Sequence, residues 1–335
     1  MAKRIRCVPP NTPVEVTCRT TQSRRLLRPS EELNDIIIGI LGKAIEMCPL
    51  LLHAFIVMSN HLHLLTTVPN AATVSRFMNY VNSNIAREVA RLHDWNARLW
   101  GRRYTAIDIL DDAALIGRLR YIMSHGCKEG LVVKPTDWPG ASSLPALLHG
   151  EQLHGTWYDR TKQYRASRRG QEPDPSLFAE AVNLPIAPIP CWAHLTPEEY
   201  QRRCAAIARD IEQETAETIR QTGRTPLGRE WVVCQDPHSR PTEVNRSPAP
   251  PCHTTDLRLR REHIRGYHEF LHAYRSASIR FRRGELDVNF PPNCFPPPRP
   301  FIAATELSGR QPTRHPPDSS VGRHPDTLRA KHPPP

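Results

Sequence analysis

The sequence contains no apolar stretch long enough to cross a membrane. Its longest apolar neighbourhood, residues 36–58, is interrupted by Lys43, Glu46 and His53, whereas a membrane-spanning helix needs about 18 or more apolar residues. The basic N-terminus is not followed by the apolar segment of a secretory signal. We therefore expect a soluble protein with no membrane partner.

Paired cysteines are also missing. The nine cysteines are odd in number and scattered, with no C-x-x-C pair. This pattern argues against both a disulfide framework and a cysteine zinc site, and it fits a reducing compartment. We therefore expect a cytoplasmic protein.

The composition is basic and rich in proline. Lys and Arg number 45 against 34 Asp and Glu, which gives a formal net charge of +11. Such an excess attracts polyanions and favours nucleic acid or an anionic membrane surface as a partner. The 34 prolines among 335 residues are about twice the usual share and crowd towards the C-terminus, so we expect the last part to be extended or poorly folded.

Hydrophobic periodicity predicts an α+β domain over the first half of the chain. Alternating or compact apolar residues indicate strands, and apolar residues at helical spacing indicate helices with Ser30 and Asp111 or Asp112 as N-caps. The strands are expected at residues 14–19, 50–58, 61–67 and 104–110, and the helices at 31–48, 72–92 and 112–126. The first six elements match a ferredoxin-like (split β-α-β) antiparallel sheet, with both helices on one face and the other face open. The helix that ends near Gly126 is an addition to that arrangement.

The composition of the chain changes after Trp138-Pro139-Gly140, where basic residues and prolines become frequent. We divide it into a domain over 1–150, a basic and proline-rich linker over 151–195, a mainly α-helical C-terminal region over 196–303, and a disordered tail over 304–335. Thr196 can cap a helix that continues to about Gln221, and residues 254–283 have a helical pattern with eight arginines. The C-terminal region is therefore a candidate for DNA recognition.

Two short motifs could carry chemistry. His61 and His63 are two apart on a predicted strand, so both imidazoles project from one face and could bind one metal ion. Tyr121 and His125 are four apart on a predicted helix and share one face of it. Each motif alone is also compatible with a structural role, as a pair of surface histidines on a hairpin or as an amphipathic helix with a C-terminal histidine.

The two motifs together resemble a known family. The segments HAFIVMSNHLHLLTTVPN and YIMSHGCKEGLVVKPTDWPGASS are similar to single-tyrosine HUH transposases, the IS200-like branch that includes the tyrosine transposases associated with repetitive extragenic palindromes (REP). His61, Leu62 and His63 stand at the HUH motif and Tyr121 at the nucleophile. At His125 the family usually has an amide side chain that contacts the metal, and an imidazole can serve as a ligand there.

The resemblance implies a DNA transposase that acts on single-stranded or hairpin DNA in the bacterial cytoplasm, associated with the nucleoid. Tyr121 would attack a backbone phosphate and form a 5′-phosphotyrosine, which a 3′-hydroxyl could later reverse to join new ends. A divalent ion, Mg²⁺ or Mn²⁺, would be held by His61, His63 and His125 and polarise the phosphate. Monomer and homodimer both remain open.

Exposed arginines are the expected contacts to the DNA backbone. The candidates are Arg103, Arg118, Arg120, Arg165, Arg168 and Arg169. As a class, most exposed arginines only solvate a protein face.

Three other functions share features with this sequence. A metal-dependent hydrolase built as a barrel needs repeated strand-helix units over about 250 residues, which this chain lacks. A replication-initiator or relaxase-like nickase shares H-x-H and tyrosine. A domesticated transposase that only binds DNA would keep the fold and the charge without catalysis.

Overall fold

The first half of the protein is built around a four-stranded antiparallel sheet with the strand order β2-β3-β1-β4. The computed structural model describes residues 5–168, 173–242 and 249–299. The sheet and the two helices that connect its strands consist of β1 (Thr12–Arg19), α1 (Glu31–Met47), β2 (Leu51–Met58), β3 (His61–Val68), α2 (Ala71–His93) and β4 (Thr105–Asp108). This order and pairing confirm the α+β, ferredoxin-like prediction.

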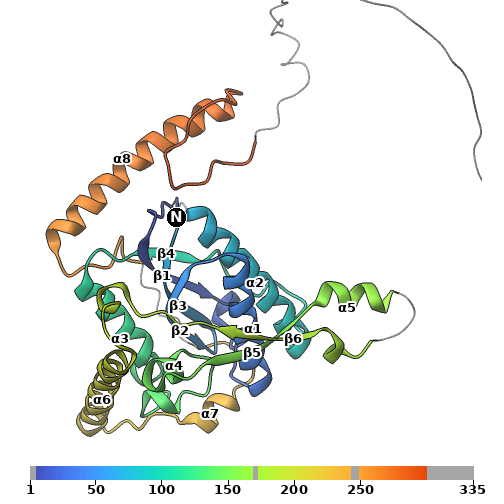
Figure 1. Cartoon of the computed structure of the whole chain (residues 1–335), viewed down its shortest axis with the longest axis vertical. Helices are drawn as coiled ribbons and strands as arrows, with labels where there is room; N and C mark the ends of the chain where they lie inside the picture. The colour runs from blue at the N-terminus through green and yellow to red at the C-terminus, as the bar shows by residue number, and fades with distance from the viewer. Residues whose placement is uncertain (1–4, 169–172, 243–248, 300–335) are drawn as a thin grey trace, which may run out of the picture.

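Alternate residues of the strands divide between the two faces of the sheet, because successive side chains point to opposite sides. Val14, Leu62 and Leu64 belong to the main apolar core, which α1 and α2 complete. Glu15, paired with Leu65 of β3, points to the other face, which bears His61 and His63. Figure 1 shows α1 and α2 on one side of the sheet and α3 (Asp112–Lys128) on the other.

The second face is not left open, and that expectation is wrong. Side chains from β2, α3, α4 (Leu144–His149) and α6 (Pro197–Thr222) form a second apolar cluster on this side. Leu115, Leu119 and Ile122 of α3 are each at most 2% exposed in it. The apolar stripe of α3 has to be buried somewhere, and the β2 side of the sheet is where it packs.

The predicted N-cap side chains accept hydrogen bonds from backbone amides in the first turn of their helices. Ser30 Oγ accepts from Leu33 N, and Asp111 Oδ1 accepts from Ala114 N at 2.7 Å. Thr196 and Glu199 form a reciprocal capping box at the start of α6. Each cap satisfies an amide that the helix itself cannot pair.

Residues 151–195, described above as a linker, contain a β-hairpin that packs on α1. Its strands are β5 (Leu153–Tyr158) and β6 (Ala179–Leu184), and α5 (Arg160–Ser167) lies between them in the chain. The hairpin approaches α1 closely: a Cβ added at Gly39 would lie 2.3 Å from the Thr156 carbonyl, and one at Gly155 would lie 2.3 Å from Gly39 N. Glycine is needed at both positions because the two backbones meet there.

The C-terminal region adds α6, α7 (Arg229–Val233) and α8 (Leu257–Arg282). Just before α8, His253 forms a parallel bridge with Ile109 at the edge of the sheet. Asp111, the N-cap of α3, accepts hydrogen bonds from Thr254 and Thr255. The chain therefore returns to the four-stranded sheet before α8 leaves it (Figure 1).

Short 3₁₀ helices complete the described residues, at Thr21–Ser23, Pro135–Asp137, Pro175–Phe178 and Pro190–Trp192. None of the helices in the described part of the chain is both long and apolar enough to span a bilayer. The predicted disordered tail, residues 304–335, lies outside the described residues.

Candidate metal and tyrosine site

The H-x-H motif lies at the start of β3, on the face of the sheet opposite α1 and α2. In the register with β1, His61 pairs with Arg19 and His63 with Thr17. Because side chains alternate, Leu62 turns into the main core while both imidazoles turn towards α3. His61 and His63 are buried, at 8% and 7% exposure.

Tyr121 and His125 come to the same place from α3. Helix α3 packs against β2 through its apolar stripe. The adjacent face of the helix carries the Tyr121 and His125 side chains, which are one turn apart. His125 is 2% exposed. The tyrosine ring lies 4.9 Å from the His125 ring and 5.5 Å from the His63 ring, measured between centroids.

His61, His63 and His125 can converge on one ion. One ligand atom from each lies within 4.8 Å of the others, and His61 Nε2 is 2.8 Å from His125 Nε2. The three ring centroids are 4.8 to 5.0 Å apart. Three imidazoles form a donor set that suits a divalent metal ion.

Neighbouring oxygens orient two of the three imidazoles. His61 Nδ1 lies 2.5 Å from Asn60 Oδ1, and His63 Nδ1 lies 2.8 Å from Glu15 Oε1. With Nδ1–H donated to these acceptors, Nε2 keeps its lone pair for a metal. His125 Nδ1 is buried and has no hydrogen-bond partner within the described residues. The arrangement fits a metal site.

The electrostatics keep His61 and His125 neutral. Burial lowers the pKa of His61 well below its ordinary value, and the neighbouring His63 lowers it further. Burial, with a contribution from His63, also lowers the pKa of His125 to about 3. Neutral imidazole is the form that ligates metals.

Two cations lie against Tyr121. The Arg118 guanidinium lies 3.9 Å from the centre of the tyrosine ring, and Lys128 Nζ lies 4.7 Å from it. Burial raises the pKa of the Tyr121 phenol, and the positive charge of Arg118 opposes that rise. A phenolate formed here would have a cationic neighbour.

Glu15 is a member of the site that the sequence motifs did not identify. It is 2% exposed, and it contacts His63, Arg118 and His253. The sequence could have indicated Glu15 only through its place in β1, where it alternates with the apolar residues Val14 and Val16 and therefore points to the opposite face. That alternation alone does not tell which strand lies next to β1.

The predicted DNA contacts do not gather in one place. Arg118 and Arg120 lie on α3 and pair with Glu15 and Glu214 at 2.9 and 2.6 Å. Arg103 is exposed just before β4, and Arg165 and Arg168 are exposed on α5 and at its C-cap. Arg169 lies outside the described residues. In Figure 1, α5 extends from the opposite side of the molecule to α3.

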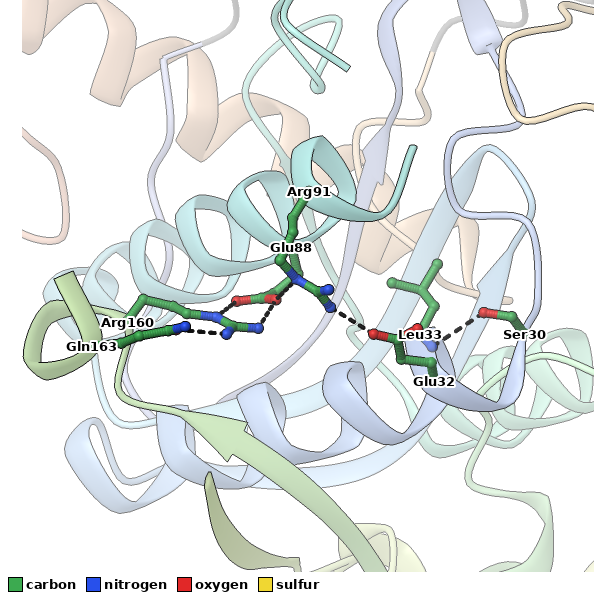
Figure 2. A network of polar contacts seen from close by, with 7 residues as sticks. All are labelled: Ser30, Glu32, Leu33, Glu88, Arg91, Arg160 and Gln163. Atoms are coloured by element: carbon green, nitrogen blue, oxygen red, sulfur yellow. Dashed lines mark hydrogen bonds and ion pairs between the residues drawn. The ribbon is translucent and has the colours of Figure 1, made fainter. Parts of the chain in front are cut away.

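A buried ion pair holds α5 in that position. Arg160 donates to both carboxylate oxygens of Glu88 on α2, at 2.7 and 2.5 Å (Figure 2). Arg91 bridges Glu88 to Glu32 of α1. Arg160 lies in the segment expected to be a basic linker, and it is a structural anchor, since its side chain is only 12% exposed and is paired with Glu88.

Comparison with known proteins gives one family match. The model of the IS200-like transposase family matches residues 14–125, the segment that contains Glu15, both histidines of β3, Tyr121 and His125. No curated protein matches the chain.

Two solved structures share similarity with part of the chain. One is a REP-associated tyrosine transposase bound to a REP hairpin, 19% identical, with a TM-score of 0.35, covering 43% of this chain and 82% of that one. The other is described as a transposase from Deinococcus radiodurans R1, 20% identical, with a TM-score of 0.27, covering 36% of this chain and 95% of that one.

Proposed function

We propose that this protein, whose residues 14–125 match the IS200-like transposase family, cleaves and rejoins single-stranded DNA through a 5′-phosphotyrosine. The observation that carries the proposal is the position of Tyr121, whose ring touches two of three buried histidines that can hold one metal ion. A nucleophile beside a metal site suits phosphodiester cleavage, since the substrate is anionic and resists attack.

The metal would be held by His61, His63 and His125, with Mg²⁺ or Mn²⁺ as the expected ion. When bound, such an ion polarises the phosphoryl oxygens and lowers the cost of the charge that builds up on them. Glu15 and Asn60 hold the His63 and His61 rings so that each Nε2 faces the site.

Tyr121 supplies the nucleophile. Its phenolic oxygen forms a bond to phosphorus and gives its proton to solvent, while the bond from phosphorus to the 3′-oxygen breaks and that oxygen takes a proton from solvent. Arg118 and Lys128 stabilise the negative charge of the phenolate through their positions at the ring. The product is a 5′-phosphotyrosine and a free 3′-hydroxyl.

The covalent intermediate favours strand transfer over simple hydrolysis. A phosphotyrosine keeps the free energy of the broken phosphodiester bond, so attack by another 3′-hydroxyl can re-form a DNA strand and release Tyr121. On the motif resemblance, we further propose a DNA hairpin as the recognised substrate.

The test is formation of a covalent adduct. The full-length protein is incubated with labelled single-stranded hairpins from the flanks of its own gene, with Mg²⁺ or Mn²⁺, and resolved on a denaturing gel. We expect a metal-dependent adduct that disappears in Tyr121→Phe and persists in Tyr164→Phe, a control at an exposed tyrosine on α5.

The outcomes separate the competing functions. An adduct whose DNA is passed to an added strand with a free 3′-hydroxyl supports the transposase. An adduct that is never transferred favours a nickase, and tight hairpin binding without any adduct favours a non-catalytic DNA-binding protein.

A further inference from the structure

The two long helices of the C-terminal region differ in charge. α8 has seven arginines and two glutamates, whereas α6 has four arginines and six carboxylates. α6 is also built into the second apolar cluster through Tyr200, Cys204 and Ile211. Of these two helices, α8 is therefore the one suited to a polyanion.

Three arginines and two histidines of α8 form one exposed stripe. At about 100° per residue, Arg261, Arg265, His268, His272 and Arg275 fall within one sector of the helix, and all five are exposed. Neither glutamate lies within this sector, and Glu262 pairs with Arg258 beside it. The stripe runs about 21 Å along the axis at about 1.5 Å per residue, which equals about six base pairs of DNA.

The opposite side of α8 is fixed to the protein. Tyr267 Oη donates to the Ile5 carbonyl at 2.9 Å, and Tyr274 Oη donates to the Phe295 carbonyl at 3.0 Å. Phe281 packs edge-on against Phe290. These contacts involve the side of α8 opposite the stripe, whose five side chains stay exposed, and Figure 1 shows α8 extending away from the sheet.

The side chains of α8 indicate which class of polyanion the stripe can bind. Unpaired bases are bound by stacking on exposed aromatic rings, but the aromatic residues of α8 lie on its inner side, half-buried or buried. Insertion into a membrane surface needs a broad apolar face, and in the described part of α8 only Leu257 and Ile279 are exposed large apolar residues. Arginines without aromatic stacking partners match the phosphate backbone of a duplex.

We propose that the stripe formed by Arg261, Arg265, His268, His272 and Arg275 binds the phosphate backbone of double-stranded DNA. This inference rests on the proposed function for its biological substrate, in which the duplex would be the stem of the hairpin. The paired stem would lie on α8 while the single strand reaches the histidines and Tyr121.

The experiment measures binding of the full-length protein to a labelled 20-base-pair duplex and to a single strand of the same length, by fluorescence anisotropy between 50 and 200 mM salt. The variant is Arg261→Gln/Arg265→Gln/Arg275→Gln. We expect its duplex Kd to rise at least tenfold at about 100 mM salt. The slope of log K against log salt should fall in magnitude by about 3, since each phosphate contact contributes about 0.9.

Two matched variants serve as controls. Arg202→Gln/Arg209→Gln/Arg220→Gln removes the same charge from exposed positions on α6 and should leave the duplex Kd within twofold. Lysine at the three α8 positions keeps the charge and should retain most of the affinity. Because all these side chains are exposed, melting temperatures should stay near that of the unchanged protein.

The proposal is overturned if the α8 glutamine variant binds duplex with unchanged affinity and salt slope, if the α6 control loses as much, or if single-strand binding falls as far as duplex binding. The readout does not depend on catalysis. If Tyr121 forms no adduct yet the α8 variant loses duplex binding, the proposed function fails and the assignment of α8 stands.

Discussion

Glu15 is a buried carboxylate with partners at both of its oxygens. Oε1 accepts from His63 Nδ1 at 2.8 Å and from Arg118 Nη2 at 2.9 Å, and Oε2 lies 2.7 Å from His253 Nε2. Burial alone would raise the pKa of Glu15, but the hydrogen bonds from His253 and His63 and the charge of Arg118 hold it well below its ordinary value. An ionised Glu15 thus fixes both the orientation of His63 and the position of Arg118 at the Tyr121 ring.

Glu15→Gln should weaken metal binding. The amide cannot hold the Nδ1–H of His63 as a carboxylate does, and loss of such an outer partner typically costs 10–100-fold in metal affinity. We expect that loss for Mn²⁺ by isothermal titration calorimetry, with a smaller change for Glu46→Gln, an exposed glutamate on α1 behind the sheet. Native affinity in a folded Glu15→Gln protein would show that Glu15 does not position the ligand.

The parts of the site that the sequence predicts are the parts set by local periodicity. His61 and His63 share a face because a strand alternates, and Tyr121 and His125 share one because a helix turns every 3.6 residues. Glu15 and His253 join the site through the pairing of β1 with β3 and through the return of the chain to β4. Both depend on long-range packing, which no local pattern encodes.

The helices and strands of the first half form where the apolar periodicity of the sequence predicts them, whereas the β5–β6 hairpin was not predicted. Its docking on α1 depends on the missing side chains of Gly39 and Gly155. Two backbones that meet at glycines do not need an apolar stripe, so the sequence contains no periodic pattern that predicts this contact. The prolines and arginines of residues 151–195 led to the prediction of a linker. Composition indicates the average tendency of a segment and does not indicate which residues it contacts.

His53 marks an irregularity in β2. The pairing of β2 with β3 shifts register between Leu52 and Ala54, so His53 stands at a β-bulge. Its Nδ1 lies 3.1 Å from the Ala187 carbonyl oxygen, and its Nε2 lies 2.8 Å from Thr67 Oγ1. The imidazole therefore ties the sheet to the segment that follows β6.

Acid should destabilise the metal-free protein, in part through His53. Burial lowers the pKa of His53, so below the ordinary imidazole value of about 6.5 the unfolded chain binds a proton that the folded protein does not. The unfolding free energy then falls as pH falls, by up to about 1.4 kcal/mol per pH unit for one such group. His61 and His125, whose pKa values are also lowered, act in the same direction.

The check is thermal melting in EDTA from pH 7 to pH 5. The melting temperature of His53→Gln, which cannot titrate, should fall less over this range than that of the unchanged protein. His154→Gln, at an exposed position on β5, should follow the unchanged protein. Identical pH profiles for all three would contradict a buried neutral His53.

For the whole molecule, the residues after 190 are part of the fold of the first half of the chain. Trp192, Tyr200, Ile211 and Val232 are buried in the second apolar cluster against α3 and β2. Burying four such side chains contributes on the order of 10 kcal/mol at about 1.5–3 kcal/mol each, which is comparable with the entire net stability of a typical domain. The helix that carries Tyr121 and His125 therefore depends on residues far along the chain.

Two truncations test this dependence and set the conditions for any deletion experiment on DNA binding. A chain that ends after residue 190 should show no cooperative melting transition, because the apolar face of α3 loses its cover. A chain that ends after residue 242 keeps α6 and α7 and should still melt cooperatively, at a lower temperature because Glu15 loses His253 and Asp111 loses Thr254. If the shorter chain melts cooperatively near the temperature of the full-length protein, the first half folds by itself and α6 adds little to its stability. If it does not, loss of cleavage on deleting the C-terminal region reports unfolding, and substitutions on the surface of α8 are the informative way to separate recognition from catalysis.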